Sequence, residues 1–283
     1  MPAPNSNCTS PGSWKQGSAK AIFADDTTLL SRGRPPDNTE GLEQAKQWFY
    51  ANKLVLNESK TARILFSSER LEARSEPVRL LGVVLDTRLN WSHQVDYVCA
   101  RLSSQLFVLR RIRPFLDGGT LRTVYFSIVH SHLTYGTLLW GNSVRSHRAF
   151  VMQKAAVRII EGVPYNTPCR PFFKKNRILP LPCIFIHDTL LYIHKNIFKF
   201  TTHANIHTYD TRYATDLAVP RSRIRMAAVN KPLVDMYNTF LRYHRIVEIH
   251  AMNVYQFSRF VKKFLLTECF YSVNEFYTHI SRR

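Results

Sequence analysis

The alternation of apolar and polar residues changes character near residue 92. Before this point the apolar runs are short, and the first, residues 21–30, surrounds the adjacent acids Asp25 and Asp26. Apolar flanks around a polar centre predict a β-hairpin with this acidic pair at its turn. Residues 37–39 then offer polar caps for a helix that stops near Asn52. The predicted apolar face of this helix comprises Leu42, Ala45, Trp48 and Phe49.

Further short strands are predicted before the change of pattern. Residues 54–56 and 62–66 are rich in apolar side chains and bracket the polar segment 57–61, as two strands joined by a loop would. Another strand is predicted from Val78 to Leu85, where Gly82 interrupts the apolar run. A glycine inside a strand pattern indicates a bulge or a close approach of other backbone.

After residue 92 the apolar positions follow helical spacing. Residues 95–112 carry one apolar stripe at three- and four-residue intervals, and Pro114 ends that helix. Similar stripes predict helices over 121–132, 148–160, 184–198 and 254–265, with an irregular connector at 200–232 that contains the basic residues Arg221, Arg223 and Arg225. The expected fold class is α+β: a hairpin, short antiparallel strands and one or two helices, followed by a mostly helical region.

Charge divides the chain at the same place. Lys and Arg number 39 against 20 Asp and Glu, a net charge of +19, and residues 93–283 carry +17 of it. A basic surface gains salt-sensitive affinity for a polyanion by releasing counterions, so nucleic acid is the favoured partner. A solvated basic surface, or a patch for ribosomes or membranes, remains an open alternative.

Composition argues against several classes of protein. No stretch approaches eighteen uncharged apolar residues, so no transmembrane helix and no membrane partner are expected. Residues 1–18 lack the apolar core of a secretory signal and are interpreted as a disordered leader. The five cysteines are scattered without C-x₂-C spacing, which indicates neither a disulfide framework nor a zinc site. A nuclear or cytoplasmic location is expected.

The acidic turn is the candidate for metal chemistry. Two adjacent carboxylates on a rigid hairpin suit Mg²⁺, which takes carboxylate oxygens together with waters and substrate phosphates. In two-metal nucleotidyl transfer, one ion activates the attacking 3′-hydroxyl and the other stabilises the leaving pyrophosphate. Adjacent aspartates are also common as solvated turn residues, so Asp25 and Asp26 alone do not identify such a site.

Three motifs in order extend the interpretation. The segment Phe23-Ala-Asp-Asp26 is followed by 52–61, where Asn52 and Asn57 precede the Lys60-Thr61 pair, and then by 80–86 with its Leu-Gly turn. Their order and spacing resemble consecutive motifs of the reverse transcriptases of non-LTR retrotransposons. Later segments resemble the jockey-like branch of that family, and the likeness covers about residues 20–283.

The resemblance implies a partial polymerase palm at 20–92 after a leader at 1–19. It implies a helical thumb and following helices at 93–199, and a connector with C-terminal helices at 200–283. The implied reaction is RNA-directed DNA synthesis with Mg²⁺ or Mn²⁺, on an RNA template and a DNA primer, without a small-molecule cofactor.

The resemblance also implies roles for individual residues. Asp25 would be the stronger metal ligand and Asp26 the auxiliary carboxylate, while Lys60 would donate a proton to the departing pyrophosphate. Gly82 would let backbone approach the primer terminus. Four arginines would face the template–primer phosphates: Arg101, Arg110, Arg111 and Arg113.

Simpler interpretations of the same residues stay open. A solvated lysine accounts for Lys60, an ordinary bulge for Gly82, and a solvated helix face for the arginines. Trp91 and His93 are expected to be a core residue and a helix cap rather than ligands.

In the family, a further carboxylate and the fingers precede the acidic turn, whereas residues 1–24 contain no Asp or Glu. We therefore expect a truncated polymerase that is inactive alone, with Asp86 as an open substitute for the further carboxylate. The alternatives are a catalytically silent nucleic-acid-binding protein that uses the basic helices, or a decayed transposon relic.

Overall fold

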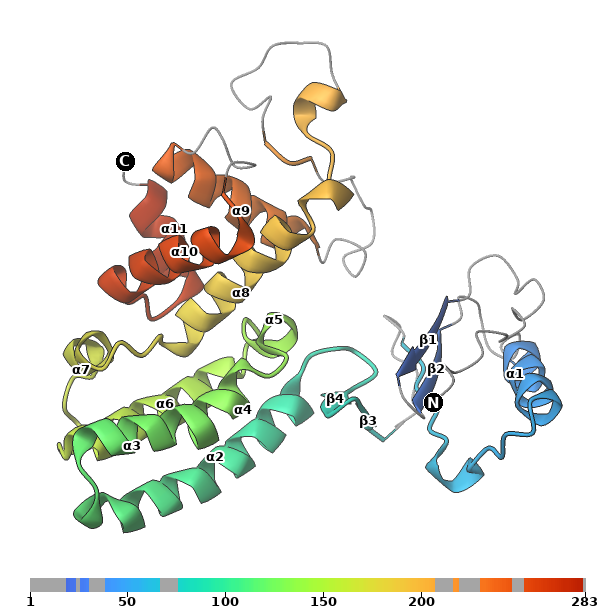
Figure 1. Ribbon diagram of the computed structural model, residues 1–283, viewed down its shortest axis with the longest axis horizontal. Helices are drawn as coiled ribbons and strands as arrows, with labels where there is room; N and C mark the ends of the chain where they lie inside the picture. The colour runs from blue at the N-terminus through green and yellow to red at the C-terminus, as the bar shows by residue number, and fades with distance from the viewer. Residues whose placement is uncertain are drawn as a thin grey trace, which may run out of the picture. The chain divides into compact units, whose positions relative to one another are not determined.

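The computed structural model describes residues 19–23, 26–30, 39–66, 76–206, 216–218, 230–245 and 252–281, with the backbone alone for 19–23, 26, 39–41 and 230. The chain divides into two compact units, residues 1–63 and residues 64–283. Figure 1 draws the elements of the first unit in blue and those of the second from teal to red. The predicted leader and the basic run at 221–225 lie outside the described residues.

A β-hairpin begins the first unit, as predicted. Strands β1 (Ala19–Phe23) and β2 (Asp26–Leu30) pair antiparallel, in a register that joins Ala19 to Leu30 and Phe23 to Asp26. Helix α1 (Thr39–Ala51) follows and confirms the predicted helix, with Ala45 buried. Asp25 and the side chain of Asp26 lie outside the described residues.

The strands predicted at 54–56 and 62–66 are wrong. Neither segment pairs with another strand in the described part of the chain. Val55 is 97% exposed, so the apolar run buries no sheet face. Between the two segments, Asn57 caps a short 3₁₀ turn, η1 (Glu58–Lys60), and its side chain accepts a hydrogen bond from the Lys60 backbone N–H at 3.3 Å. Local capping prevails because an isolated strand has no partner to satisfy its backbone.

The single strand predicted from 78 to 85 is instead a second hairpin. Strands β3 (Val78–Leu80) and β4 (Val83–Leu85) pair antiparallel, and Leu81 and Gly82 form the two-residue turn between them. Their φ angles are +46° and +81°. Positive φ at both central residues is the geometry of a type I′ hairpin turn. Gly82 therefore reverses the chain here and does not form a bulge.

Most of the remaining described residues of the second unit are helical (Figure 1). Its helices are α2 (Ser92–Ile112), α3 (Gly118–Val124), α4 (Ser131–Thr134), α5 (Thr137–Trp140), α6 (Ser146–Glu161), α7 (Arg170–Lys175), α8 (Leu181–Lys195), α9 (Asn230–His244), α10 (Val254–Glu268) and α11 (Val273–Ser281). The helices predicted over 95–112, 148–160 and 254–265 are confirmed as α2, α6 and α10. Pro114 lies in the 3₁₀ turn η2 (Arg113–Phe115) that directly follows α2.

Three other helices differ from the prediction. The stripe at 121–132 runs through α3, a π-helical turn η3 (Tyr125–His130) and α4. The helix predicted over 184–198 ends at Lys195, and a separate 3₁₀ turn, η4 (Ile197–Lys199), follows. Helix α9 begins inside the predicted connector, whose described part also contains the 3₁₀ turn η5 (His203–Asn205).

One hydrophobic core joins α2 to α11, and a buried glutamine lies within it. The side chain of Gln153 donates to the Tyr125 hydroxyl and to the Leu179 carbonyl, both at 2.9 Å, and accepts from the Leu181 N–H at 2.7 Å. Since a buried amide without partners is costly, this network favours one mutual arrangement of η3, α6 and α8. The fold is mostly helical with small antiparallel sheets, which is compatible with the predicted α+β class.

The described cysteines are all free and buried. They are Cys99 on α2, Cys169 before α7, Cys183 on α8 and Cys269 after α10. Burial raises the pKa of each of these thiols, so each is held in its protonated form.

Across the described ranges, no helix combines the length and the apolar character needed to cross a membrane.

Candidate nucleic-acid interface

A buried carboxylate fixes the start of α2. Asp86 is 7% exposed, and its carboxylate accepts hydrogen bonds from the backbone N–H groups of Arg88 and Asn90 at 3.1 Å and of Trp91 at 2.9 Å. These bonds use its oxygens to hold the loop between β4 and α2. Asp86 therefore has a structural role in this loop, and its role as a substitute metal ligand is untested.

Trp91 and His93 lie at the same helix start. Trp91 packs against the core, as predicted, and occupies the N-cap position of α2 with φ +65°. His93 is the second residue of the helix and is exposed, and the side chain at the N-cap makes no capping hydrogen bond. The prediction that His93 caps the helix is therefore wrong, because the Asp86 carboxylate satisfies the backbone before the first turn.

Hydrogen bonds join the β3–β4 hairpin to the helices at its tip and along one edge. The Val84 N–H donates to the Gln94 side chain at 2.8 Å, and the Tyr135 hydroxyl donates to the Leu81 carbonyl. A Cβ at Gly82 would lie 3.4 Å from the Tyr135 ring. The small size and positive φ of Gly82 thus serve packing within this unit. A contact between Gly82 and a primer stays a prediction.

A basic ridge follows the outer face of α2. Tyr97, Arg101, Ser104, Val108 and Arg111 are spaced four, three, four and three residues apart, which places them along one face of the helix. Arg79 of β3 joins this row at its N-terminal end, since its guanidinium donates to the Tyr97 hydroxyl at 2.7 Å. We call these six residues the basic ridge.

Tyr97 lies between two guanidinium groups on the ridge. The Cζ atoms of Arg79 and Arg101 lie 4.8 Å and 5.4 Å from the centre of its ring, within the range of cation–π attraction. Hydrogen bonding to Arg101 and the nearby positive charges lower the pKa of the Tyr97 hydroxyl. The ridge therefore presents an aromatic ring and fixed positive charge together.

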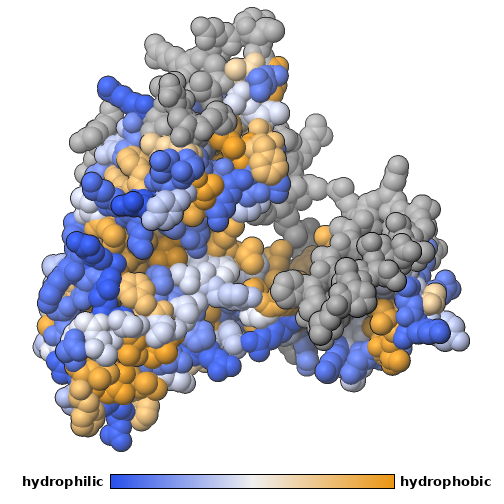
Figure 2. All heavy atoms as spheres, viewed as in Figure 1, coloured by the Kyte–Doolittle hydropathy of each residue, from blue (hydrophilic) through white to orange (hydrophobic). Residues whose placement is uncertain are grey.

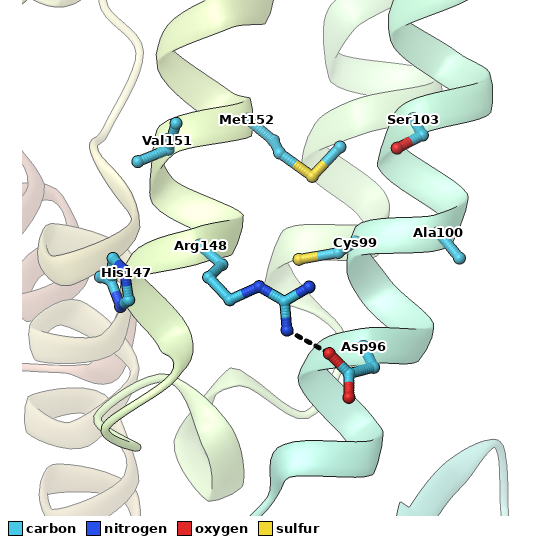
Figure 3. A pocket seen from close by; sticks show the side chains of 8 residues that line it. All are labelled: Asp96, Cys99, Ala100, Ser103, His147, Arg148, Val151 and Met152. Carbon is cyan, nitrogen blue, oxygen red and sulfur yellow. Dashed lines mark hydrogen bonds and ion pairs between the residues drawn. The ribbon is translucent and has the colours of Figure 1, made fainter.

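Among the ion pairs of the described residues, none joins an arginine of the ridge to an acidic side chain. The single acid of α2, Asp96, lies on another face of the helix, where it pairs with Arg145, the N-cap residue of α6, and with Arg148 inside α6. Figure 3 shows Arg148 reaching across a groove between the two helices to Asp96. The groove has a volume of about 480 Å³ and is lined mainly by small and apolar side chains: Cys99, Ala100, Ser103, Val151 and Met152. Its charged side chains are paired with each other, whereas those of the ridge face outward.

Only two of the four predicted arginines share the ridge. Arg101 and Arg111 lie on it, whereas Arg110 projects from a neighbouring face of α2, one residue round the helix. The guanidinium of Arg113 packs against Gly162, since a Cβ there would lie 1.6 Å from it. Gly162 is the C-cap of α6, where the exposed carbonyls attract a cation. That contact accounts for Arg113 without a nucleic acid.

The sequence-based prediction did not include Arg79 and Tyr97. Tyr97 precedes Arg101 by one helical turn, and Arg79 is the outward residue of the pattern Val78-Arg79-Leu80. Both signals were present, but only the hairpin fold brings β3 beside α2. Lys60 lies in the first unit, exposed in η1, and its predicted catalytic role is untested.

Apolar side chains continue the surface at the far end of α2. Phe107 and Phe115 are 61% and 84% exposed, and the Arg111 guanidinium lies 5.9 Å from the Phe107 ring centre. Figure 2 shows hydrophobic atoms gathered over the end where α2 turns into α3. The outer face of α2 is therefore basic and aromatic rather than uniformly polar.

The chemistry of the acidic turn fits a hard divalent cation. Carboxylate oxygens are the ligands that Mg²⁺ prefers, and Asp26 is the first residue of β2, where it pairs with Phe23 of β1. Within the residues that the structure describes, no cluster of three or more His, Cys, Asp or Glu side chains is arranged to hold a metal.

Fold and surface together define a strongly basic, mostly helical protein with an antiparallel hairpin beside its basic ridge. Comparison with known proteins adds two relatives from Drosophila melanogaster. The chain is 25% identical over 228 residues to a probable RNA-directed DNA polymerase from transposon X-element, a match that covers 73% of this chain and 23% of that protein. It is 27% identical over 172 residues to a probable RNA-directed DNA polymerase from transposon BS, covering 51% and 18% respectively.

These relatives support the resemblance to reverse transcriptases of transposable elements. The chain spans about a fifth of the length of each. No protein-family model and no solved structure matches it.

Proposed function

We propose that this chain is the nucleic-acid-binding part of a non-LTR, jockey-like retrotransposon reverse transcriptase. The observation that carries the proposal is the basic ridge. Two guanidinium groups on α2 and one on β3 lie along one row with Tyr97. Such a row suits a duplex backbone, because arginines neutralise phosphates and release counterions. The similarity to two transposon polymerases supports an RNA template and a DNA primer as the natural duplex.

The proposed reaction is nucleotidyl transfer onto a primer 3′-hydroxyl. Asp25 and Asp26 would hold Mg²⁺ or Mn²⁺, which supplies Lewis-acid stabilisation of phosphate oxygens when bound. Lys60 would be the proton donor to the pyrophosphate, and Gly82 would lie near the primer. The proposal includes a nuclear or cytoplasmic location, where the protein would encounter its RNA template and DNA primer.

We further propose that catalysis needs a carboxylate beyond the acidic turn. In the resembled family it precedes that turn. Asp86, the open substitute, accepts hydrogen bonds from three backbone N–H groups. The residues around the basic ridge would therefore bind a primer–template duplex without supplying that carboxylate.

Binding tests the ridge directly. The equilibrium Kd of a fluorescein-labelled RNA–DNA hybrid is measured by anisotropy from 50 to 300 mM KCl. The double substitution Arg101→Gln/Arg111→Gln is expected to weaken binding and to flatten the slope of log Kd against log salt by about 2, one step per lost phosphate contact.

A matched pair controls for net charge. Lys174→Gln/Lys231→Gln removes the same charge from exposed positions on α7 and α9. This pair should leave the salt slope within about 0.5 of the original, on the same counterion argument. Equal losses from both pairs would mean that diffuse charge binds the duplex, and the ridge would lose its role.

Primer extension separates the polymerase from a silent binding protein. The chain is incubated with a primed RNA template, deoxynucleotides and Mg²⁺ or Mn²⁺, and the product length is followed. No extension by a chain that binds the duplex supports the second proposal. Extension that survives Asp25→Ala would remove the acidic turn from the mechanism.

A further inference from the structure

A second basic and aromatic surface lies on α8 and α10, which are distinct from the ridge helix. Helix α8 presents Tyr192 and Lys195 to solvent, and α10 presents Tyr255, Arg259 and Lys262. Within each helix these residues are three or four positions apart, so each set shares one face. We call the five residues the α8–α10 surface.

Contacts across the two helices bring the C-terminal half of α8 beside the N-terminal half of α10. Helices α8 and α10 pack antiparallel: His187 bonds to Ser258 at 3.2 Å, while His194 stacks on Phe257 with ring centres 4.1 Å apart. The His194 ring also reaches the Met252 carbonyl at 3.0 Å. This register brings the turn of α8 that carries Tyr192 alongside the first turn of α10, which carries Tyr255.

Two charged side chains lie near one partly buried ring. Asp188 on α8 and Lys262 on α10 both act electrostatically on His130 of η3. Asp188 precedes Tyr192 by one turn, and Lys262 follows Ser258 by one turn. Asp188 and Lys262 therefore both lie on the side of α8 and α10 that faces η3.

The surface is positive and holds exposed rings. Tyr255 is 69% exposed and Tyr192 is 36% exposed, and the Arg259 guanidinium lies 5.7 Å from the Tyr255 ring centre. Asp188, the only acid of α8, is bonded to His187. Beyond the end of α8, Phe198 is 78% exposed, with the Lys199 ammonium 5.6 Å from its ring centre.

We propose that the α8–α10 surface binds a single-stranded nucleic acid, with Tyr192 and Tyr255 stacking on unpaired bases and Lys195, Arg259 and Lys262 neutralising the phosphates. Exposed rings interleaved with cations are the chemistry that holds single strands, because every base offers a face for stacking. A duplex hides those faces, so it gains only the charge. The surface thus differs in ligand from the basic ridge and does not rest on polymerase activity.

The test compares single strands with a duplex on the full chain. Anisotropy gives the Kd values of 12-nucleotide oligo(U), oligo(dT) and an RNA–DNA hybrid at one salt concentration. Tyr192→Ala/Tyr255→Ala is expected to weaken single-strand binding about tenfold or more, with less than a twofold change for the hybrid. Tyr50→Ala/Tyr165→Ala, which removes two other tyrosines that are each 87% exposed, is the matched control and should change neither.

Two further readouts complete the test. Unequal losses for oligo(U) and oligo(dT) would identify the strand as RNA or DNA. Ultraviolet cross-linking of oligo(U), mapped by mass spectrometry, should mark α8 and α10 peptides in the original chain. The proposal is overturned by tyrosine variants that leave single-strand binding unchanged, because that result describes charge without stacking.

Discussion

At the residue scale, two glycines of the second unit face opposite demands. Gly82 has φ +81° and lies against the Tyr135 ring, whereas Gly118 begins α3 with no atom within 4 Å of an added Cβ. The same chemical change should therefore have opposite effects at the two positions. Comparing the two substitutions separates the effect of the backbone conformation from the general effect of replacing a glycine.

We expect Gly82→Ala to destabilise the chain by about 1–2 kcal/mol, because the left-handed conformation costs an L-residue about that much. Gly118→Ala should be neutral or stabilise by up to about 1 kcal/mol, through the lower entropy of the unfolded chain. Urea unfolding followed by circular dichroism gives both values. A similar loss at the two positions would contradict the assignment of a type I′ turn.

His130 gives a second prediction at this scale. Burial, with a smaller effect of Lys262, lowers the pKa of His130 to about 4, while Asp188 acts in the opposite direction. The unfolded chain binds the proton near pH 6.5, so stability is fully present above that value and falls as pH drops toward 4. The loss at the lower limit is on the order of 3 kcal/mol.

Replacing His130 by Phe should flatten this pH dependence, because the site then has nothing to titrate. The ring lies among Tyr125 and Phe126, and its Nδ1 has no hydrogen-bond partner in the described part of the chain. Phenylalanine therefore suits the surroundings. Urea midpoints at pH 7.5, 6 and 5 are the measurement, and an unchanged pH profile in the variant would assign the acid sensitivity elsewhere.

At the element scale, α10 has a complete capping box. The Asn253 side chain accepts from the Gln256 N–H at 2.9 Å, and the Gln256 side chain accepts from the Asn253 N–H at 3.2 Å. Since α10 carries part of the α8–α10 surface, its first turn also positions Tyr255. Capping and the proposed binding surface are thus connected through one helix end.

Asn253→Ala should cost about 1 kcal/mol of stability, the usual loss for a removed N-cap. Thr267→Ala, near the other end of α10, removes only a hydroxyl that bonds to the Lys263 carbonyl one turn back. It should change stability by less than about 0.5 kcal/mol. Thermal unfolding of the two variants in parallel tests the contrast, and equal shifts in Tm would remove the capping argument.

The same scale explains what the sequence could and could not predict. The first hairpin, α1, α2, α6 and α10 were predictable because their patterns are strong and local. Helix α9 was missed although Val234, Tyr237 and Leu241 share a face, because Pro232 and the polar residues around it suggested a connector. Strands at 54–56 and 62–66 were predicted from local pattern, whereas a strand exists only with a partner.

The candidate site was predictable in composition but not in arrangement. Arg101 and Arg111 could be placed on one helical face from spacing alone. The contact of Arg79 with Tyr97 depends on the β3–β4 turn, and the position of Arg113 depends on the end of α6. Both are tertiary contacts between distant segments, and the local sequence pattern of either segment does not indicate that the two meet.

At the scale of the whole molecule, a net charge of +19 opposes compaction. Salt screens this self-repulsion over about 8–10 Å, so it should stabilise the fold while it weakens nucleic-acid binding. We expect Tm to rise by a few degrees, roughly 2–5 °C, between 50 and 300 mM KCl. Differential scanning calorimetry at each salt concentration measures this change in Tm.

A charge-reduced variant provides the control for that rise. Lys174→Glu/Lys231→Glu lowers the net charge by four from exposed positions. Its Tm should depend less on salt than that of the original chain. A Tm that falls with salt in both chains would show that attractive ion pairs, rather than repulsion, dominate the electrostatic free energy of folding.

The buried cysteines have a consequence for handling and for time-resolved work. Alkylating reagents attack the thiolate, and Cys99, Cys169, Cys183 and Cys269 are shielded from solvent and held protonated. Each becomes reactive only when its own helix opens. Since they lie on or beside α2, α7, α8 and α10, pulsed iodoacetamide labelling reports, residue by residue, the order in which the second unit comes apart.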